Sequence, residues 1–220
     1  MSPTLFHDVL LATGETLYMV FASTFFAVML GFPLGTWLFA CTKLKPNRLL
    51  QRVLNALINI SRSIPFIILL VALIPVTRLI IGTSIGVHAA IVPLTLGAVP
   101  FFARLVDNAY QRLPSGLLDA GYAMGADSLQ MIRYILFPEA KPALIQAVTL
   151  TAITLVNYSA MAGTVGGGGL GDLAIRYGYQ RFDVMVMLIT VCFLIIIVQL
   201  IQFCGDRMTT YLSRGKFSCV

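Results

Sequence analysis

One apolar stretch of the chain carries a regular series of polar side chains. Thr151, Thr154, Tyr158 and Met161 follow one another at helical intervals, with Asn157 beside them. This spacing puts the series on one face of a helix. In a membrane helix, polar groups usually face the bundle interior or a cavity. The face is typical either of an interhelical hydrogen-bond seam or of the lining of a translocation path. The candidate path residues are Thr154, Asn157, Tyr158 and Met161.

Charged side chains that would bind a zwitterion are missing from the middle of the apolar stretches. We therefore expect a weakly binding passage rather than a tight site. Arg62 lies at the end of one apolar stretch, just before Pro65. A snorkelling arginine that sets the membrane topology is the favoured interpretation of this residue.

Patterns for catalysis or metal binding are not found in the sequence. It has no GxxxxGK[ST] phosphate loop, no HExxH motif and no nucleophile–base pair. Segment 163–171 formally contains GxGxxG, but it does not follow a strand, so the dinucleotide-binding interpretation fails. The four cysteines have no metal-ligand spacing. We expect no enzymatic activity, no cofactor and no metal in this chain.

A polar segment, 115–138, interrupts the apolar pattern and carries signals for two short helices around a break. Gly125 suits a left-handed cap at the end of the first helix. Asp127 and Gln130 have the spacing of an N-cap residue and its reciprocal partner. A second helix is therefore expected to follow and to end at Pro138. Taken alone, this pattern is typical both of a segment that packs on its own bundle and of one that docks on another protein.

The same segment resembles the EAA loop of bacterial ABC-importer permeases, whose pattern is EAA-x3-G-x9-I-x-LP. Here it reads DAG at 119–121, G at 125 and ILFP at 135–138. The three departures from the pattern keep the charge or the size class of the residue. In that family a short cytoplasmic helix docks on a separate ATP-hydrolysing subunit. The resemblance assigns ATPase coupling to Asp119, Ala120, Gly121, Met124, Gly125 and Ala126.

Further stretches resemble the methionine-importer permeases within that family. They are RSIPFIILL (62–70), GTSIG (82–86), AIVPLT (90–95), YSAM (158–161), GGLG (168–171) and QFCGDR (202–207). The resemblance implies a homodimeric path for L- and D-methionine and two ATPase subunits that bind ATP and Mg²⁺. It also implies an extracytoplasmic methionine-binding lipoprotein. Composition and spacing alone indicate only a membrane protein with a coupling loop.

The elements that must position these residues are membrane helices. The 220 residues are 58% hydrophobic and 11% charged, with a mean hydropathy of +0.89, whereas globular domains have about 25% charged residues. A spanning helix needs about 20 apolar residues, so the sequence predicts an all-α membrane protein with one domain over 1–220. The resemblance implies the type I ABC-importer permease fold with a cytoplasmic coupling helix. Five spans are expected, at approximately 17–40, 57–81, 85–102, 143–162 and 184–203.

The distribution of positive charge predicts the orientation. All but three of the 15 Lys and Arg residues fall in 42–62, in 103–142 and after residue 203. The positive-inside rule puts these segments in the cytoplasm of a bacterial inner membrane, with the N-terminus outside and the C-terminus inside. Despite the net charge of +6, basic residues are not interleaved with aromatic ones, so no nucleic-acid partner is expected. The N-terminal residues lack a basic n-region, and no cleaved signal peptide is expected.

Alternatives from other classes stay open at this point. A permease for another amino acid or a small osmolyte would share the coupling loop. A self-contained channel or ion-coupled carrier would be favoured by ionisable residues at the membrane midplane, and none is evident. A membrane-embedded enzyme would need a catalytic cluster that the sequence lacks.

Overall fold

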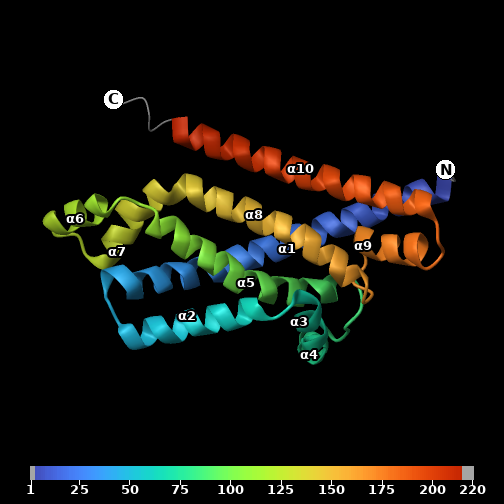
Figure 1. The fold of residues 1–220 in the computed structure, drawn as a ribbon, viewed down its shortest axis with the longest axis horizontal. Helices are drawn as coiled ribbons and strands as arrows, with labels where there is room; N and C mark the ends of the chain where they lie inside the picture. The colour runs from blue at the N-terminus through green and yellow to red at the C-terminus, as the bar shows by residue number, and fades with distance from the viewer. Residues whose placement is uncertain (1–2, 215–220) are drawn as a thin grey trace.

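The computed structural model describes residues 3–214, which form helices and short turns without a β-strand (Figure 1). The all-α fold expected from the sequence is confirmed. The helices, with their π-helical turns marked η, are α1 (Pro3–Phe39), η1 (Ala40–Leu44), α2 (Arg48–Ser63), α3 (Phe66–Ala72), α4 (Ile74–Ile81), α5 (Val87–Gln111), α6 (Ser115–Ala123), α7 (Ser128–Gln130), η2 (Met131–Leu136), α8 (Phe137–Gly163), α9 (Gly169–Leu173), η3 (Ala174–Tyr179) and α10 (Val184–Arg214).

Four helical segments of the described chain are long and apolar enough to cross a membrane. A fifth span is reached when the bent pair α2–α3 counts as one. Apolar side chains such as Phe21 and Phe25 are exposed along these segments, as expected of helices that face lipid. The first span begins earlier than expected, and the third continues past Phe102. The four segments are Leu5–Leu44, Val87–Gln111, Ser128–Gly163 and Val184–Ser213.

The expected span 57–81 is not one continuous helix, and this expectation is corrected. Pro65 has no N–H, and its ring disfavours a helical conformation of the residue before it. Ile64 accordingly has an extended backbone, with φ −79° and ψ 124°. The chain turns by 97° between α2 and α3. After a second break, α4 ends at Gly82, which has a φ of +84°.

Pro138 does not end the helix that begins at Ser128, which is a second correction. Residues Ser128–Gly163 are one long helical segment. The turn η2 just before the proline is π-helical, and the N–H of Phe137 donates to the oxygen of Ile132, five residues back. The wider turn changes the hydrogen-bond register immediately before a residue that cannot donate. The polar loop is therefore joined to α8 without a hinge.

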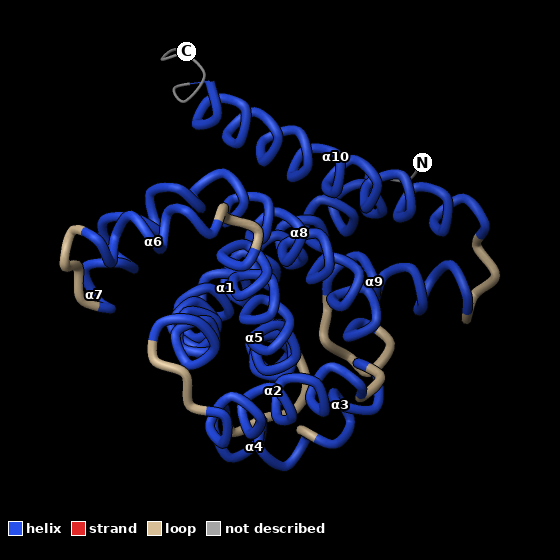
Figure 2. Tube along the Cα trace, turned by 60° about the vertical axis from the view of Figure 1, so that its left-hand side comes forward, coloured by secondary structure: helices blue, strands red, loops and turns tan. Residues whose placement is uncertain are grey.

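The centre of the bundle is formed by α1, α5 and α8, which pack on one another. Their shared core contains the buried side chains of Met19, Leu94 and Leu155. In Figure 2, α2, α3 and α4 lie on one side of α5, and α10 lies on the opposite side against α8. Close approach of α1 to α5 depends on Gly31 and Gly35, because a Cβ at Gly35 would meet the backbone of Ala103. This is the close backbone contact typical of small-xxx-small motifs.

The two ends of the bundle carry different elements (Figure 1). The beginning of α1 and the short helix α9 lie at one end, whereas α6, α7 and the end of α10 lie at the other. The start of α1 and the end of α10 therefore lie at opposite ends of the bundle. The expected coupling loop lies at the same end as the end of α10.

Candidate functional site

The polar loop has the helix–break–helix geometry predicted for it. Helix α6 ends in a left-handed glycine, Gly125, with a φ of +77°. The N–H of Gly125 donates to the oxygen of Tyr122, and the N–H of Ala126 to that of Gly121, both at 3.0 Å. This pair of bonds is a Schellman motif, which satisfies carbonyl groups that the end of the helix leaves unpaired. The glycine at 125 is thus required by the backbone itself.

The second helix begins at the capping box predicted from its sequence. The Oδ1 atom of Asp127 accepts from the N–H of Gln130 at 2.7 Å, and the Gln130 side chain accepts from the N–H of Asp127 at 2.9 Å. Two N–H groups that a helix start leaves unpaired are satisfied in this way. Both ends of the break are consequently fixed by local hydrogen bonds.

The residues assigned to ATPase coupling do not all lie on the outer surface. Asp119, Ala120, Met124 and Gly125 are exposed, and Ala126 is half-buried. Gly121 is buried, and a Cβ there would lie 2.6 Å from the Sδ and Cε atoms of Met131. The expectation that Gly121 faces a partner is therefore not met in the single chain. The small residue at this position serves the packing of α6 on η2.

Three apolar side chains of the loop are markedly more exposed than its others. The exposed fractions are 75% for Met124, 70% for Leu129 and 69% for Tyr134. Leu129 and Tyr134 were not among the residues predicted from the sequence, although their place in the second helix of the loop was a usable signal. Exposed apolar side chains at the end of a bundle are typical of a protein–protein contact. We call Asp119, Met124, Leu129 and Tyr134 the loop surface.

The polar residues predicted to share one face of α8 differ in burial and in hydrogen bonding. Thr151 is buried, and its hydroxyl donates to the oxygen of Ala147 at 2.8 Å. The Thr154 hydroxyl likewise donates to Leu150, at 2.8 Å. Both bonds lie within α8, so these two threonines do not form the interhelical seam considered above. The other three candidates differ in exposure: Asn157 and Met161 are exposed, and Tyr158 is half-buried.

The ring of Tyr158 stacks on that of Phe66 from α3, with centroids 4.1 Å apart and planes 2° from parallel. This contact crosses from α8 to the helix that follows the break at Pro65. A cavity of about 240 Å³ lies beside it and includes Arg62 in its lining. Sequence reasoning missed this grouping, because only the break at Ile64–Pro65 brings Arg62 and Tyr158 to one cavity.

The glycine-rich segment 163–171 is held by α1. The Oε2 atom of Glu15 accepts from the N–H of Gly169 at 2.7 Å, and the Thr16 hydroxyl accepts from that of Leu170 at 2.9 Å. The N–H of Gly86 also donates to Gly166 at 2.9 Å. Glu15 was missed at the sequence level, where it lies just before the first expected span, 17–40. The segment is a structural junction and not a nucleotide site.

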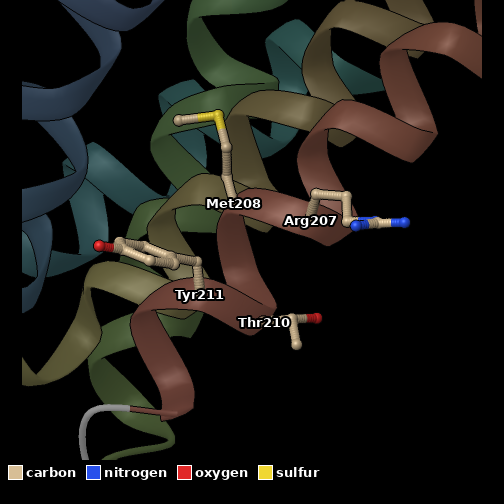
Figure 3. Close-up of a pocket in the computed structure, with 4 residues that line it drawn as sticks. All are labelled: Arg207, Met208, Thr210 and Tyr211. Atoms are coloured by element: carbon tan, nitrogen blue, oxygen red, sulfur yellow. The ribbon is translucent and has the colours of Figure 1, made fainter.

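A hollow of about 690 Å³ lies near the end of α10 (Figure 3). Arg207, Met208, Thr210 and Tyr211 line it, and all four belong to that one helix. In Figure 3, Met208 and Tyr211 extend to one side of α10 and Arg207 to the other. Among the described residues, α10 alone lines the hollow, so the part of the chain that the structure describes forms an open surface there. Across residues 3–214, no group of three or more His, Cys, Asp or Glu side chains is arranged to hold a metal ion.

Comparison with known proteins places this geometry in a family. Residues 18–218 match the family model described as "Binding-protein-dependent transport system inner membrane component". A probable D-methionine transport system permease protein MetI of Vibrio cholerae is 55% identical over 204 residues, which cover 91% of each chain. The D-methionine transport system permease protein MetI of Escherichia coli K12 is 54% identical over 151 residues, covering 68% of this chain and 70% of the relative.

Solved structures show the same relationship. An inward-facing structure of the MetNI methionine ABC transporter has a chain 49% identical to this one, with a TM-score of 0.94. The match covers 96% of this chain and 99% of that chain. An amino acid ABC transporter solved with histidines has a TM-score of 0.70 at 18% identity, a likeness of fold alone.

Proposed function

Because the chain belongs to the family of inner-membrane components of binding-protein-dependent transport systems, we propose that it is the permease subunit of an ATP-driven methionine importer. Two copies form the translocation path for L- and D-methionine. The substrate assignment depends on the similarity to a methionine ABC transporter over nearly the whole chain. The curated relatives, named for D-methionine transport, support the same substrate.

ATP hydrolysis belongs to a partner ATPase that binds ATP and Mg²⁺, since this chain has no phosphate-loop motif. The loop surface supplies the contact, because its apolar side chains are exposed at one end of the bundle. Closure of two ATPase subunits moves α6 as a rigid element. The continuous helix from Ser128 to Gly163 carries that displacement into the membrane.

The orientation follows from the charge distribution, with the loop surface in the cytoplasm and the N-terminus outside. In this arrangement α9 and the glycine-rich segment lie at the extracytoplasmic end. There a methionine-binding lipoprotein delivers substrate to the homodimer. The absence of a charged side chain at the middle of α8 supports delivery by a separate receptor rather than capture by the permease.

The proposal is tested in proteoliposomes that contain the chain, its ATPase and the receptor, with ATP enclosed on the ATPase side. We expect concentrative uptake of labelled L-methionine that requires ATP and is reduced by excess D-methionine. Competition by unrelated amino acids without competition by D-methionine contradicts the methionine assignment and favours another amino acid or a small osmolyte. Concentrative uptake by the chain without any ATPase contradicts the ABC-permease assignment and favours a self-contained carrier.

A further inference from the structure

The cavity at the break between α2 and α3 joins four helices. It has a volume of about 240 Å³ and lies between Ser61 and Arg62 of α2, Phe66 of α3, Gly97 and Phe101 of α5, and Tyr158 of α8. Gly97 lies near the middle of α5, whereas Ser61 and Arg62 are exposed, so the cavity extends from the middle of α5 to the outer side of the bundle. Drug-sized ligands occupy pockets of about 300–1,000 Å³, so this cavity suits only a smaller molecule.

Two polar groups in the lining are unpaired. Among residues 3–214, no acidic side chain forms an ion pair with Arg62, and the Tyr158 hydroxyl has no hydrogen-bond partner. The Arg62 guanidinium instead lies 5.8 Å from the centroid of the Phe101 ring, within the range of a cation–π contact. Arg62 is exposed, so its guanidinium remains accessible to an anion that enters the cavity. The cavity therefore offers one positive group and one free hydroxyl.

Apart from Ser61, the rest of the lining consists of Gly97 and of aliphatic and aromatic side chains. Phe66 and Tyr158 are stacked face to face, and Phe66 is buried. A Cβ at Gly97 would lie 3.3 Å from the Phe66 ring, which shows that the glycine leaves the ring room to pack on α5. Thioether side chains make favourable contacts with aromatic rings, often at the ring edge.

We propose that the cavity of Arg62, Phe66, Phe101 and Tyr158 is a low-affinity binding site for a neutral α-amino acid with an apolar side chain. The Arg62 guanidinium pairs with the carboxylate, for which its planar fork is suited. The aromatic stack receives the side chain, and the Tyr158 hydroxyl accepts from the ammonium group. This inference rests on the proposed function, because it gives the imported amino acid a resting place along its path.

The break at Pro65 explains how a membrane segment can hold such a site. Pro65 ends α2 with Arg62 near its last turn, and the 97° bend then directs α3 toward Tyr158. No acidic residue lines the cavity to bind the ammonium group. The site consequently binds weakly, as suits a passage from which the substrate must leave. A basic amino acid is disfavoured, because Arg62 repels a second positive charge.

The direct test is protection of a cysteine in the cavity. In a complex with the ATPase in which all four native cysteines are replaced, Ser61→Cys is labelled with a small water-soluble thiol reagent. L-methionine at twice its dissociation constant leaves about one third of the sites free, so labelling slows about threefold. Ile60→Cys is the matched control, since Ile60 is exposed on the same helix but outside the lining. Its labelling is expected to stay unchanged, as is that of Ser61→Cys with L-lysine.

Transport kinetics separate substrate binding from a role in topology. Arg62→Gln is expected to raise the KM for methionine about tenfold, which corresponds to loss of a charge-assisted contact. Arg62→Lys keeps the charge that sets topology but loses the fork, so its KM is expected to lie in between. Arg52→Gln removes the same charge from an exposed position on α2 outside the cavity and is expected to transport normally.

The outcomes distinguish this site from the proposed function. Methionine uptake by the unmodified chain, with equal labelling of Ser61→Cys in the presence and absence of methionine, overturns the site and leaves the importer assignment intact. Normal KM in Arg62→Lys with inactive Arg62→Gln also overturns it, since that pattern means that only the topology-setting charge matters. Absence of methionine uptake refutes the proposed function. In that case protection of Ser61→Cys by another neutral amino acid supports the site, and protection by none refutes it.

Discussion

At Asp107 the chain buries a carboxylate inside α5. Its exposed fraction is 1%, and its Oδ2 atom accepts from Arg104 at 3.2 Å and from Gln111 at 2.8 Å. Arg104 also donates to Asn55 at 2.7 Å and to Asn59 at 3.0 Å, and both asparagines belong to α2. One guanidinium therefore neutralises a buried acid and fixes the helix that carries Arg62.

Removing only the arginine is expected to be strongly destabilising. Arg104→Met leaves Asp107 as an unpaired buried charge, which costs about 3–5 kcal/mol of the free energy of unfolding. The double variant Arg104→Met, Asp107→Leu replaces both charges by apolar groups and should recover most of the loss. Unfolding of the purified protein in detergent measures both effects. A double variant as unstable as the single one would show that the contacts to Asn55 and Asn59 dominate.

Features of single residues that are set by their neighbours in the sequence could be predicted. The capping box at Asp127 and the left-handed Gly125 follow from local backbone requirements, and both are present. The inward position of Gly121 and the cavity around Arg62 depend on contacts with Met131 and Tyr158. Sequence spacing does not contain those contacts, because they arise only when helices from distant segments pack.

At the junction of α8 with α9, two glycines lie in close contact with the backbone of the other helix or its flank. A Cβ at Gly163 would meet the backbone of Asp172, and one at Gly171 would meet the backbone of Ala160. These two glycines let the chain reverse direction with backbone against backbone. The neighbouring bonds from Glu15 and Thr16 then fix α9 on α1.

Gly171→Ala is expected to destabilise the protein by about 1–3 kcal/mol, because backbone atoms cannot move aside for the added methyl group. Gly14→Ala is the control: it lies within α1, and nothing is within 4 Å of the added Cβ. There alanine should stabilise the helix by up to about 1 kcal/mol. Thermal unfolding of both variants measures the difference. Equal thermal unfolding temperatures of Gly171→Ala and Gly14→Ala would mean that the junction accommodates the added methyl group without loss of stability.

Apolar runs predicted that helices would exist but not where they would break. The span expected at 57–81 is divided because Pro65 favours an extended conformation of Ile64, and α2 and α3 are bent by 97° at that point. Pro138 also lacks an N–H, but the helix continues through it because the π-helical turn η2 precedes it. Whether a proline ends a helix depends on the hydrogen-bond register before it, which composition does not reveal.

In the whole molecule, only a few elements connect the loop surface to the proposed translocation path. Helix α6 lies between α5 and the segment from Ser128 to Gly163, and α8 packs on α1, α5 and α10. A displacement of α6 therefore reaches the centre of the bundle without crossing a flexible hinge. Coupling should be sensitive to the outer face of α6 and insensitive to exposed charges elsewhere at the same end.

Asp119→Lys is expected to lower ATP-dependent uptake about tenfold, the usual effect of losing one important interface contact, while insertion and stability are retained. Asp119 is exposed on α6, so its replacement disturbs no core. Asp206→Lys makes the same charge change on an exposed residue near the end of α10 and should transport normally. Uptake and co-purification of the ATPase are measured for both variants in the assembled complex. Equal loss in both variants would indicate a general charge effect, whereas full activity of Asp119→Lys would remove this residue from the coupling contact.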